Sequence, residues 1–112
     1  MEIYHNPRCQ KSRETLAILE ASGKEFTIRK YLEDPPTEEE LRVLISKLKI
    51  KPLELIRDNE KLFKEQYKGE KRTDEEWIRI MSENPRLIQR PIVVSGDRAV
   101  LGRPPENVKE LL

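Results

Sequence analysis

The chain contains a single cysteine, Cys9, which is the clearest candidate for a chemical role. Cys9 lies between a short apolar stretch and a helical pattern. Near the start of a helix, free backbone N–H groups and the helix dipole favour the thiolate form of a cysteine. Four side chains of the same segment can carry positive charge: His5, Arg8, Lys11 and Arg13. The sequence therefore predicts a reactive thiolate close to a site for an anion.

Two neighbours of Cys9 can take part in proton transfer or hydrogen bonding. His5 can assist ionisation or proton transfer at the thiol, or it can order the loop by hydrogen bonding, and both roles stay open. Ser12 stands where a Cys-x-x-Cys pair has its second cysteine. We expect its hydroxyl group to donate to the thiolate or to cap the helix. Because no second thiol is present, redox turnover requires a thiol from outside the chain.

Three arginines are candidates for binding a tetrahedral oxyanion: Arg57, Arg90 and Arg103. The planar guanidinium group stays charged and donates paired hydrogen bonds to such an anion. Arg90 and Arg103 each precede a proline and flank an expected hairpin. Because 38% of the residues are charged, the simpler interpretation of each of these arginines, taken alone, is a solvated surface residue. The candidate site therefore depends on the fold that brings these side chains together.

A β-α-β order is predicted for the start of the chain. Residues 3–4 head a short strand, residues 10–22 have a helical pattern that ends at Gly23, and residues 26–32 predict a second strand. Such strands run parallel, with a crossover helix between them.

Helices and then a hairpin are expected in the rest of the chain. Residues 37–40 and 73–76 have the spacing of capping boxes before amphipathic patterns, with short helices expected between them. Residues 91–94 and 99–101 predict an antiparallel pair of strands. Two prolines, at 104 and 105, begin a final helical segment.

This order predicts an α/β chain with a thioredoxin-like fold. We expect a single domain over residues 1–112, with a small four-stranded mixed sheet and a helical insertion after the second strand, at about 37–84. In that fold the loop before the third strand has a cis-proline that faces the reactive cysteine. Pro91 is the candidate, and it would bring Arg90 beside Cys9.

The composition excludes several classes of function. A net charge of +1, from 22 basic and 21 acidic residues, gives no reason to expect nucleic acid or a membrane as partner. The chain has no apolar run that could span a bilayer and no signal peptide, so we expect a cytoplasmic protein. One histidine and one cysteine make a zinc site unexpected, and we expect a monomer without a bound cofactor or metal.

The segment Tyr4-His5-Asn6-Pro7-x-Cys9-x-x-Ser12-Arg13 resembles the opening motif of the glutaredoxin-linked arsenate reductase (ArsC) family. The similarity continues through residues 31–36, 55–57 and 87–94 and ends near residues 103–104, so it covers nearly the whole chain. The resemblance puts the nucleophile of the family on Cys9, its activity-linked histidine on His5 and its oxyanion-binding arginines on Arg57, Arg90 and Arg103. Ser12, Arg13 and Pro91 are expected to support the site.

The resemblance implies a reductase that acts on arsenate. Arginines would hold arsenate beside Cys9, whose thiolate would attack arsenic, and the adduct would be resolved by glutathione and glutaredoxin as external reductants. The Cys-x5-Arg loop of tyrosine phosphatases does not fit, because Arg13 follows Cys9 after only three residues. Two alternatives stay open: a Spx-type transcription regulator that binds RNA polymerase, and a thiol-transfer enzyme of the same fold with another substrate. The missing second cysteine and the retained arginines weigh against the regulator.

Overall fold

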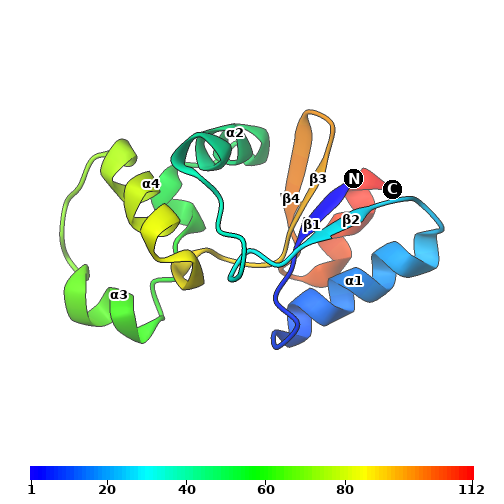
Figure 1. Ribbon diagram of the computed structural model, residues 1–112, viewed down its shortest axis with the longest axis horizontal. Helices are drawn as coiled ribbons and strands as arrows, with labels where there is room; N and C mark the ends of the chain where they lie inside the picture. The colour runs from blue at the N-terminus through cyan, green and yellow to red at the C-terminus, as the bar shows by residue number, and fades with distance from the viewer. The chain divides into compact units, whose positions relative to one another are not determined.

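The first and last segments of the chain fold together around one sheet. In the computed structural model, which describes residues 1–112, Met1–Asp34 and Arg90–Leu112 form one compact unit (Figure 1). Its strands are β1 (Glu2–Tyr4), β2 (Thr27–Arg29), β3 (Ile92–Ser95) and β4 (Arg98–Leu101). The strand order is β2-β1-β3-β4, and only the β1–β2 pair is parallel. The predicted four-stranded mixed sheet is confirmed.

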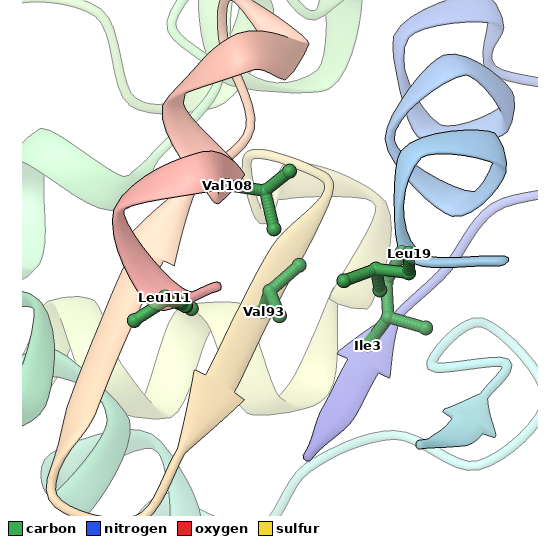
Figure 2. Close-up of a cluster of buried hydrophobic side chains, with 5 residues drawn as sticks. All are labelled: Ile3, Leu19, Val93, Val108 and Leu111. Carbon is green, nitrogen blue, oxygen red and sulfur yellow. The ribbon is translucent and has the colours of Figure 1, made fainter. Parts of the chain in front are cut away.

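The core of this unit lies between the sheet and two helices. Helix α1 (Gln10–Ser22) and the 3-10 helix η3 (Pro105–Leu111) pack against each other, and both contribute to a buried cluster on the sheet (Figure 2). The side chains of this cluster are Ile3, Leu19, Val93, Val108 and Leu111. Burial of each such side chain contributes about 1.5–3 kcal/mol. The cluster therefore fixes β1 relative to α1, and Cys9 lies between these two elements.

The prediction for α1 is confirmed at both ends, but the prediction for the second strand is too long. Gly23 ends α1 with φ 75°, in the left-handed region that favours glycine. Strand β2 ends at Arg29, because the chain then turns: the N–H groups of Glu33 and Asp34 both donate to the carbonyl oxygen of Lys30. The pattern of residues 26–32 was misleading because Tyr31, which is 1% exposed, is buried in this turn and not in a strand.

The second compact unit, Pro35–Gln89, is mainly helical. It contains α2 (Glu38–Leu48), η1 (Pro52–Leu55), α3 (Lys61–Gln66), α4 (Asp74–Glu83) and η2 (Pro85–Leu87). Helix α4 packs against α2, η1 and η2, and its side chains Trp77, Ile80 and Met81 are buried. None of the helices in the chain is both long enough and apolar enough to cross a lipid bilayer.

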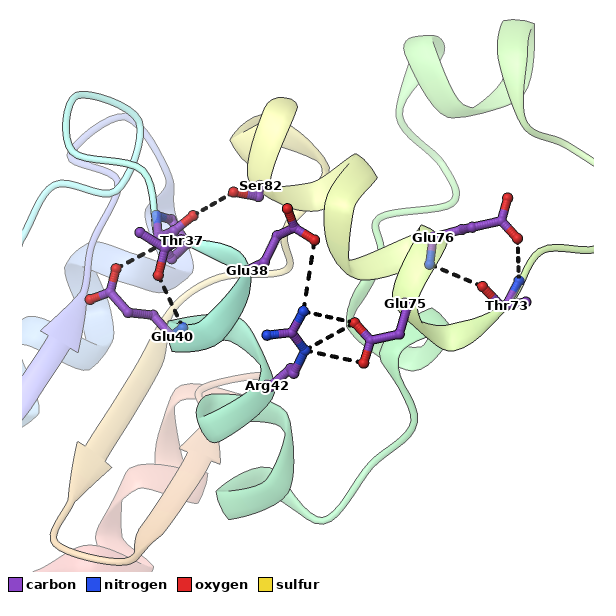
Figure 3. Close-up of polar contacts among 9 residues, drawn as sticks. Thr37, Glu38, Glu40, Arg42, Thr73, Glu75, Glu76 and Ser82 are labelled. Carbon is purple, nitrogen blue, oxygen red and sulfur yellow. Dashed lines mark hydrogen bonds and ion pairs between the residues drawn. The ribbon is translucent and has the colours of Figure 1, made fainter.

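Two capping boxes define where the long helices of this unit begin (Figure 3). The hydroxyl group of Thr37 accepts from the N–H of Glu40 at 3.1 Å, and the Glu40 carboxylate accepts from the N–H of Thr37 at 2.9 Å. Thr73 and Glu76 repeat this pair of bonds at 3.2 Å and 3.1 Å. A cap of this kind stabilises a helix by about 1 kcal/mol. Both predicted capping boxes are thus confirmed.

Candidate active site around Cys9

Cys9 is the N-cap residue of α1, directly after the turn that follows β1. The turn is closed by the N–H of Cys9, which donates to the carbonyl oxygen of Asn6 at 3.0 Å, and by the N–H of Arg8, which donates to Asn6 Oδ1 at 3.0 Å. The carbonyl oxygen of Cys9 accepts from the N–H of Arg13 at 3.0 Å. The free, half-buried thiol therefore lies at the N-terminus of α1, where the sequence pattern predicts it.

The pKa of the Cys9 thiol is lowered from its ordinary value. Partial burial by itself raises this pKa, but the N–H of Ser12, the side chain of Arg90 and the N–H of Lys11 together outweigh burial. The thiol forms no regular capping hydrogen bond, so we attribute the effect of the two N–H groups mainly to their partial charge at the helix end. The cation that acts on the thiolate is Arg90, which is remote in the sequence, and not a basic side chain of residues 8–13.

Arg90 reaches Cys9 from the segment before β3. Its side chain lowers the pKa of Cys9 both as a hydrogen-bond donor and as a positive charge. Its Nε atom is buried and has no hydrogen-bond partner. A buried donor without a partner costs free energy. Arg90 is thus in contact with the sulfur of Cys9 and keeps one donor unpaired.

The Arg90–Pro91 peptide bond is cis, as expected for the residue before the third strand. Pro91 is buried, and its carbonyl oxygen accepts from the N–H of Gly102 at 2.9 Å. The Arg103–Pro104 bond is also cis, which the sequence did not indicate. Arg103 is exposed, and its Nη1 donates to the carbonyl oxygen of Arg90 at 3.1 Å. The structure therefore brings Arg103 next to the backbone of Arg90.

Gly102 is a structural residue of the site that sequence analysis missed. A Cβ atom at this position would lie 2.7 Å from Thr15 Oγ1 and 2.8 Å from Pro91 Cγ. Both distances are too short for real contacts, so only glycine lets the end of β4 approach α1 and Pro91 this closely. The available signal was a glycine directly before an arginine–proline pair, but sequence alone does not show what packs against it.

His5 and Ser12 form a buried pair below the loop. His5 is 5% exposed and Ser12 is 0% exposed, and His5 Nδ1 lies 2.6 Å from Ser12 Oγ. Ser12 Oγ also accepts from the N–H of Asn6 at 3.0 Å. Because the hydroxyl proton has no other acceptor, we assign it to His5 Nδ1, which leaves the imidazole proton on Nε2.

The Ser12 hydroxyl group is therefore engaged with His5 and Asn6. The sequence suggested that it bonds to the thiolate or caps the helix, and the structure shows neither contact. Burial, followed by the charges of Lys30 and Arg13, lowers the pKa of His5. A neutral His5 that holds Ser12 agrees with the loop-ordering role, which was one of the two roles left open by the sequence.

Two other predicted residues have structural contacts. Arg13 is exposed, and its Nη1 donates to the carbonyl oxygen of Pro7 at 2.9 Å, which braces the turn before Cys9. Arg57 belongs to the other compact unit, where its Nη1 donates to the carbonyl oxygen of Arg86 at 3.2 Å and lies 3.2 Å from Glu60 Oε2. The first unit by itself brings together Cys9, Arg90 and Arg103.

The arrangement around Cys9 combines a stabilised thiolate with donors suited to an anion. Such a thiolate can attack an electrophilic centre or exchange with a disulfide, and the adjacent guanidinium group can balance negative charge. No three His, Cys, Asp or Glu side chains are grouped as metal ligands would be.

The comparisons with known proteins place the chain in one family. The model of the ArsC family matches residues 4–111. An arsenate reductase of Escherichia coli is 46% identical over 111 residues, which cover 98% of this chain and 79% of the relative. The uncharacterized protein YfgD of the same species is 45% identical over 114 residues, with 100% and 96% covered. A solved arsenate reductase structure from Vibrio cholerae is 46% identical, has a TM-score of 0.95, and covers 100% of this chain and 98% of that chain. The chain belongs to the ArsC family and has its thioredoxin-like fold.

Proposed function

We propose that this protein is an arsenate reductase with Cys9 as the nucleophile. The observation that carries the proposal is the pairing of Cys9 with Arg90: the arginine lowers the pKa of the thiol and has a buried Nε without a partner. Relatives that are named arsenate reductases, at 42% and 46% identity, support the choice of substrate. A thiolate beside an unsatisfied guanidinium donor fits an oxyanion whose central atom is attacked by sulfur.

In the first step the Cys9 thiolate would attack arsenic. A sulfur–arsenic bond forms, one arsenate oxygen leaves as water after protonation, and arsenic stays in its As(V) state. Arg90 and the N–H groups at the start of α1 would stabilise the negative charge of this adduct more than that of the free anion. Arg103, beside the Arg90 backbone, is a second candidate donor. Arg57 enters the proposal through the family motif alone.

In the second step an external thiolate would attack the sulfur of Cys9. A disulfide bond forms, the sulfur–arsenic bond breaks, and arsenic takes the electron pair and leaves as As(III), in arsenite. Another thiol then attacks the mixed disulfide and frees Cys9. The chain has no second cysteine, so both thiols come from outside. Glutathione and glutaredoxin are the proposed donors.

His5 is proposed as a positioning residue. Its neutral ring holds the Ser12 side chain, and the backbone N–H of Ser12 is the group that lowers the pKa of Cys9 most strongly. Loss of His5 is therefore expected to reduce activity by loosening the loop before Cys9, while the pH midpoint of Cys9 alkylation stays unchanged because the backbone N–H of Ser12 is kept. Its effect would differ from loss of a proton carrier, because the remaining activity would keep the pH dependence of the unmodified chain.

A coupled turnover assay tests the proposed function. The assay contains arsenate, glutathione, glutaredoxin and an NADPH-driven recycling system, and we expect arsenite formation that disappears in Cys9→Ser. Arg57→Ala is compared with Arg79→Ala, an exposed arginine of the same unit. We expect a raised arsenate KM for the first variant only. Folded protein whose Cys9 still alkylates but which forms no arsenite would refute the reductase. Retained thiol exchange in that case would indicate a thiol-transfer enzyme.

A further inference from the structure

The side chain of Asn107, in η3, closes the segment that carries Arg103. Its Nδ2 donates to the carbonyl oxygen of Leu101 at 3.3 Å and to that of Arg103 at 3.2 Å. An amide nitrogen has two hydrogens, so both bonds can form at the same time. One half-buried amide thus ties the last residue of β4 to the arginine two positions later.

Backbone bonds hold the rest of this segment but not the carbonyl group of Arg103. The N–H of Gly102 donates to the carbonyl oxygen of Pro91 at 2.9 Å. The N–H of Arg103 donates to the carbonyl oxygen of Leu101, also at 2.9 Å. Neither bond ends on the carbonyl oxygen of Arg103, so the amide of Asn107 is the group that fixes this peptide.

Helix stability does not explain an asparagine at this position. Asparagine is a poor helix former that favours helix starts, where its side chain accepts from backbone N–H groups. Helix η3 has no side-chain cap of that kind, and the amide of Asn107 donates to carbonyl oxygens that precede the helix. The contact therefore orders the segment before η3 and not η3 itself.

The segment that Asn107 holds is connected to Cys9 through two arginines. Nη1 of Arg103 donates to the carbonyl oxygen of Arg90 at 3.1 Å, and the side chain of Arg90 acts on the Cys9 thiol. That bond uses one of the five N–H groups of the Arg103 guanidinium. Because the side chain of Arg103 is exposed, the other N–H groups are accessible to an anion.

We propose that Asn107 is a positioning residue, which holds Arg103 so that its guanidinium group and that of Arg90 donate to the same oxyanion. The inference rests on the proposed function, in which both arginines bind arsenate beside Cys9. An exposed arginine that is free to turn loses side-chain entropy when it binds an anion, and a donor that is already held in place avoids part of this loss. Without the amide of Asn107, the backbone of Arg103 would be less ordered and its side chain would bind arsenate more weakly.

Asn107→Leu tests this role in the full chain, because it removes the amide, adds no charge and keeps the volume of the side chain. We expect kcat/KM for arsenate to fall about three- to tenfold, mostly through KM, and Arg103→Ala to lose about tenfold or more, the order expected for one charged hydrogen bond. In the Arg103→Ala background, Asn107→Leu should not lower kcat/KM further. Its loss of stability should be the same in both backgrounds, because alanine keeps the carbonyl oxygen that Asn107 binds.

Arsenate binding is also measured without turnover, as the arsenate concentration that protects half of the Cys9 thiol from iodoacetamide in the absence of glutathione. Asn107→Leu should raise this concentration. The pH midpoint of Cys9 alkylation should stay unchanged, because the side chain of Arg90, and not its carbonyl oxygen, acts on the thiol. Asn107→Ala should give the same results and replaces Asn107→Leu if that variant does not fold.

Asn84→Leu is the matched control, because Nδ2 of the half-buried Asn84 also donates to a backbone carbonyl oxygen, that of Ile80 at 3.0 Å, in the second unit. Equal losses of kcat/KM for Asn84→Leu and Asn107→Leu would overturn the inference. An undiminished effect of Asn107→Leu in the Arg103→Ala background would overturn it as well. Weaker arsenate protection in Asn107→Leu, with no arsenite formed by any chain, would refute the proposed function alone. Arsenite formation and protection that do not respond to Asn107→Leu would refute the positioning role alone.

Discussion

Replacing Ser12 with alanine separates two roles of this residue, since its hydroxyl holds the loop while its backbone N–H acts on the thiolate. The change leaves His5 Nδ1 and the N–H of Asn6 without their partner. An unsatisfied buried polar group costs about 1–3 kcal/mol, and we take the low end for the half-buried Asn6 and the full range for His5. Alanine regains roughly 0.5 kcal/mol of helix propensity. The free energy of unfolding should fall by about 1.5–3.5 kcal/mol.

The ionisation of Cys9 should not change in the same variant. Alanine keeps the backbone N–H of residue 12, which is the group that lowers the pKa of the thiol most strongly. The pH midpoint of Cys9 alkylation should therefore match that of the unmodified chain. Stability of the first unit is best followed by amide hydrogen exchange of α1, because Cys9 already reacts in the folded chain and the only tryptophan, Trp77, belongs to the second unit.

Ser22→Ala is the matched control within the same unit. Its hydroxyl donates to the carbonyl oxygen of Leu19 at 2.6 Å and accepts from the N–H of Lys24 at 3.2 Å, but the side chain is only half-buried. Water can replace these contacts, so we expect a loss of at most about 1 kcal/mol. A smaller loss for Ser12→Ala than for Ser22→Ala would refute the importance of the buried pair. A raised alkylation midpoint in Ser12→Ala would show that the hydroxyl acts on the thiolate after all.

Three further predictions concern other contacts of the site. Gly102→Ala forces a Cβ atom against Thr15 and Pro91 and should lower the free energy of unfolding by about 1–3 kcal/mol, which a denaturant titration measures. The double variant Gly102→Ala with Thr15→Ala should lose less free energy of unfolding than the sum of the losses of the two single variants. Arg90→Met should raise the pKa of Cys9, read as a higher pH midpoint of alkylation, and an unchanged midpoint would contradict the assigned contact. Burial lowers the pKa of His5 below 6.5, so the unfolded chain binds the proton of this histidine more readily than the folded chain, and stability is lost as pH falls below about 6.5. The free energies of unfolding of the unmodified chain and of His5→Gln, compared across that pH range, measure this loss. Parallel pH curves for the two chains would exclude it.

Local chemistry explains which elements were predictable. The bounds of α1 follow from its helical spacing and from Gly23, and both long helices of the second unit follow from capping boxes, which are formed by residues only three positions apart. The end of β2 was not predictable in this way. Tyr31 looks like a strand residue, but it is buried in a turn, and burial depends on what the rest of the chain places around it.

Neighbouring residues and composition are enough to predict that Cys9 begins a helix and that the chain has no second thiol. The groups that surround that sulfur depend on the three-dimensional fold. Arg90 acts on Cys9, Gly102 packs against Thr15, and Lys30 faces the loop of Arg8 across a groove. These partners are far apart along the chain and meet only because β1 pairs with both β2 and β3 in one sheet and α1 packs on it. The local pattern had pointed to the basic residues next to Cys9, whereas the fold assigns the main cationic effect to Arg90.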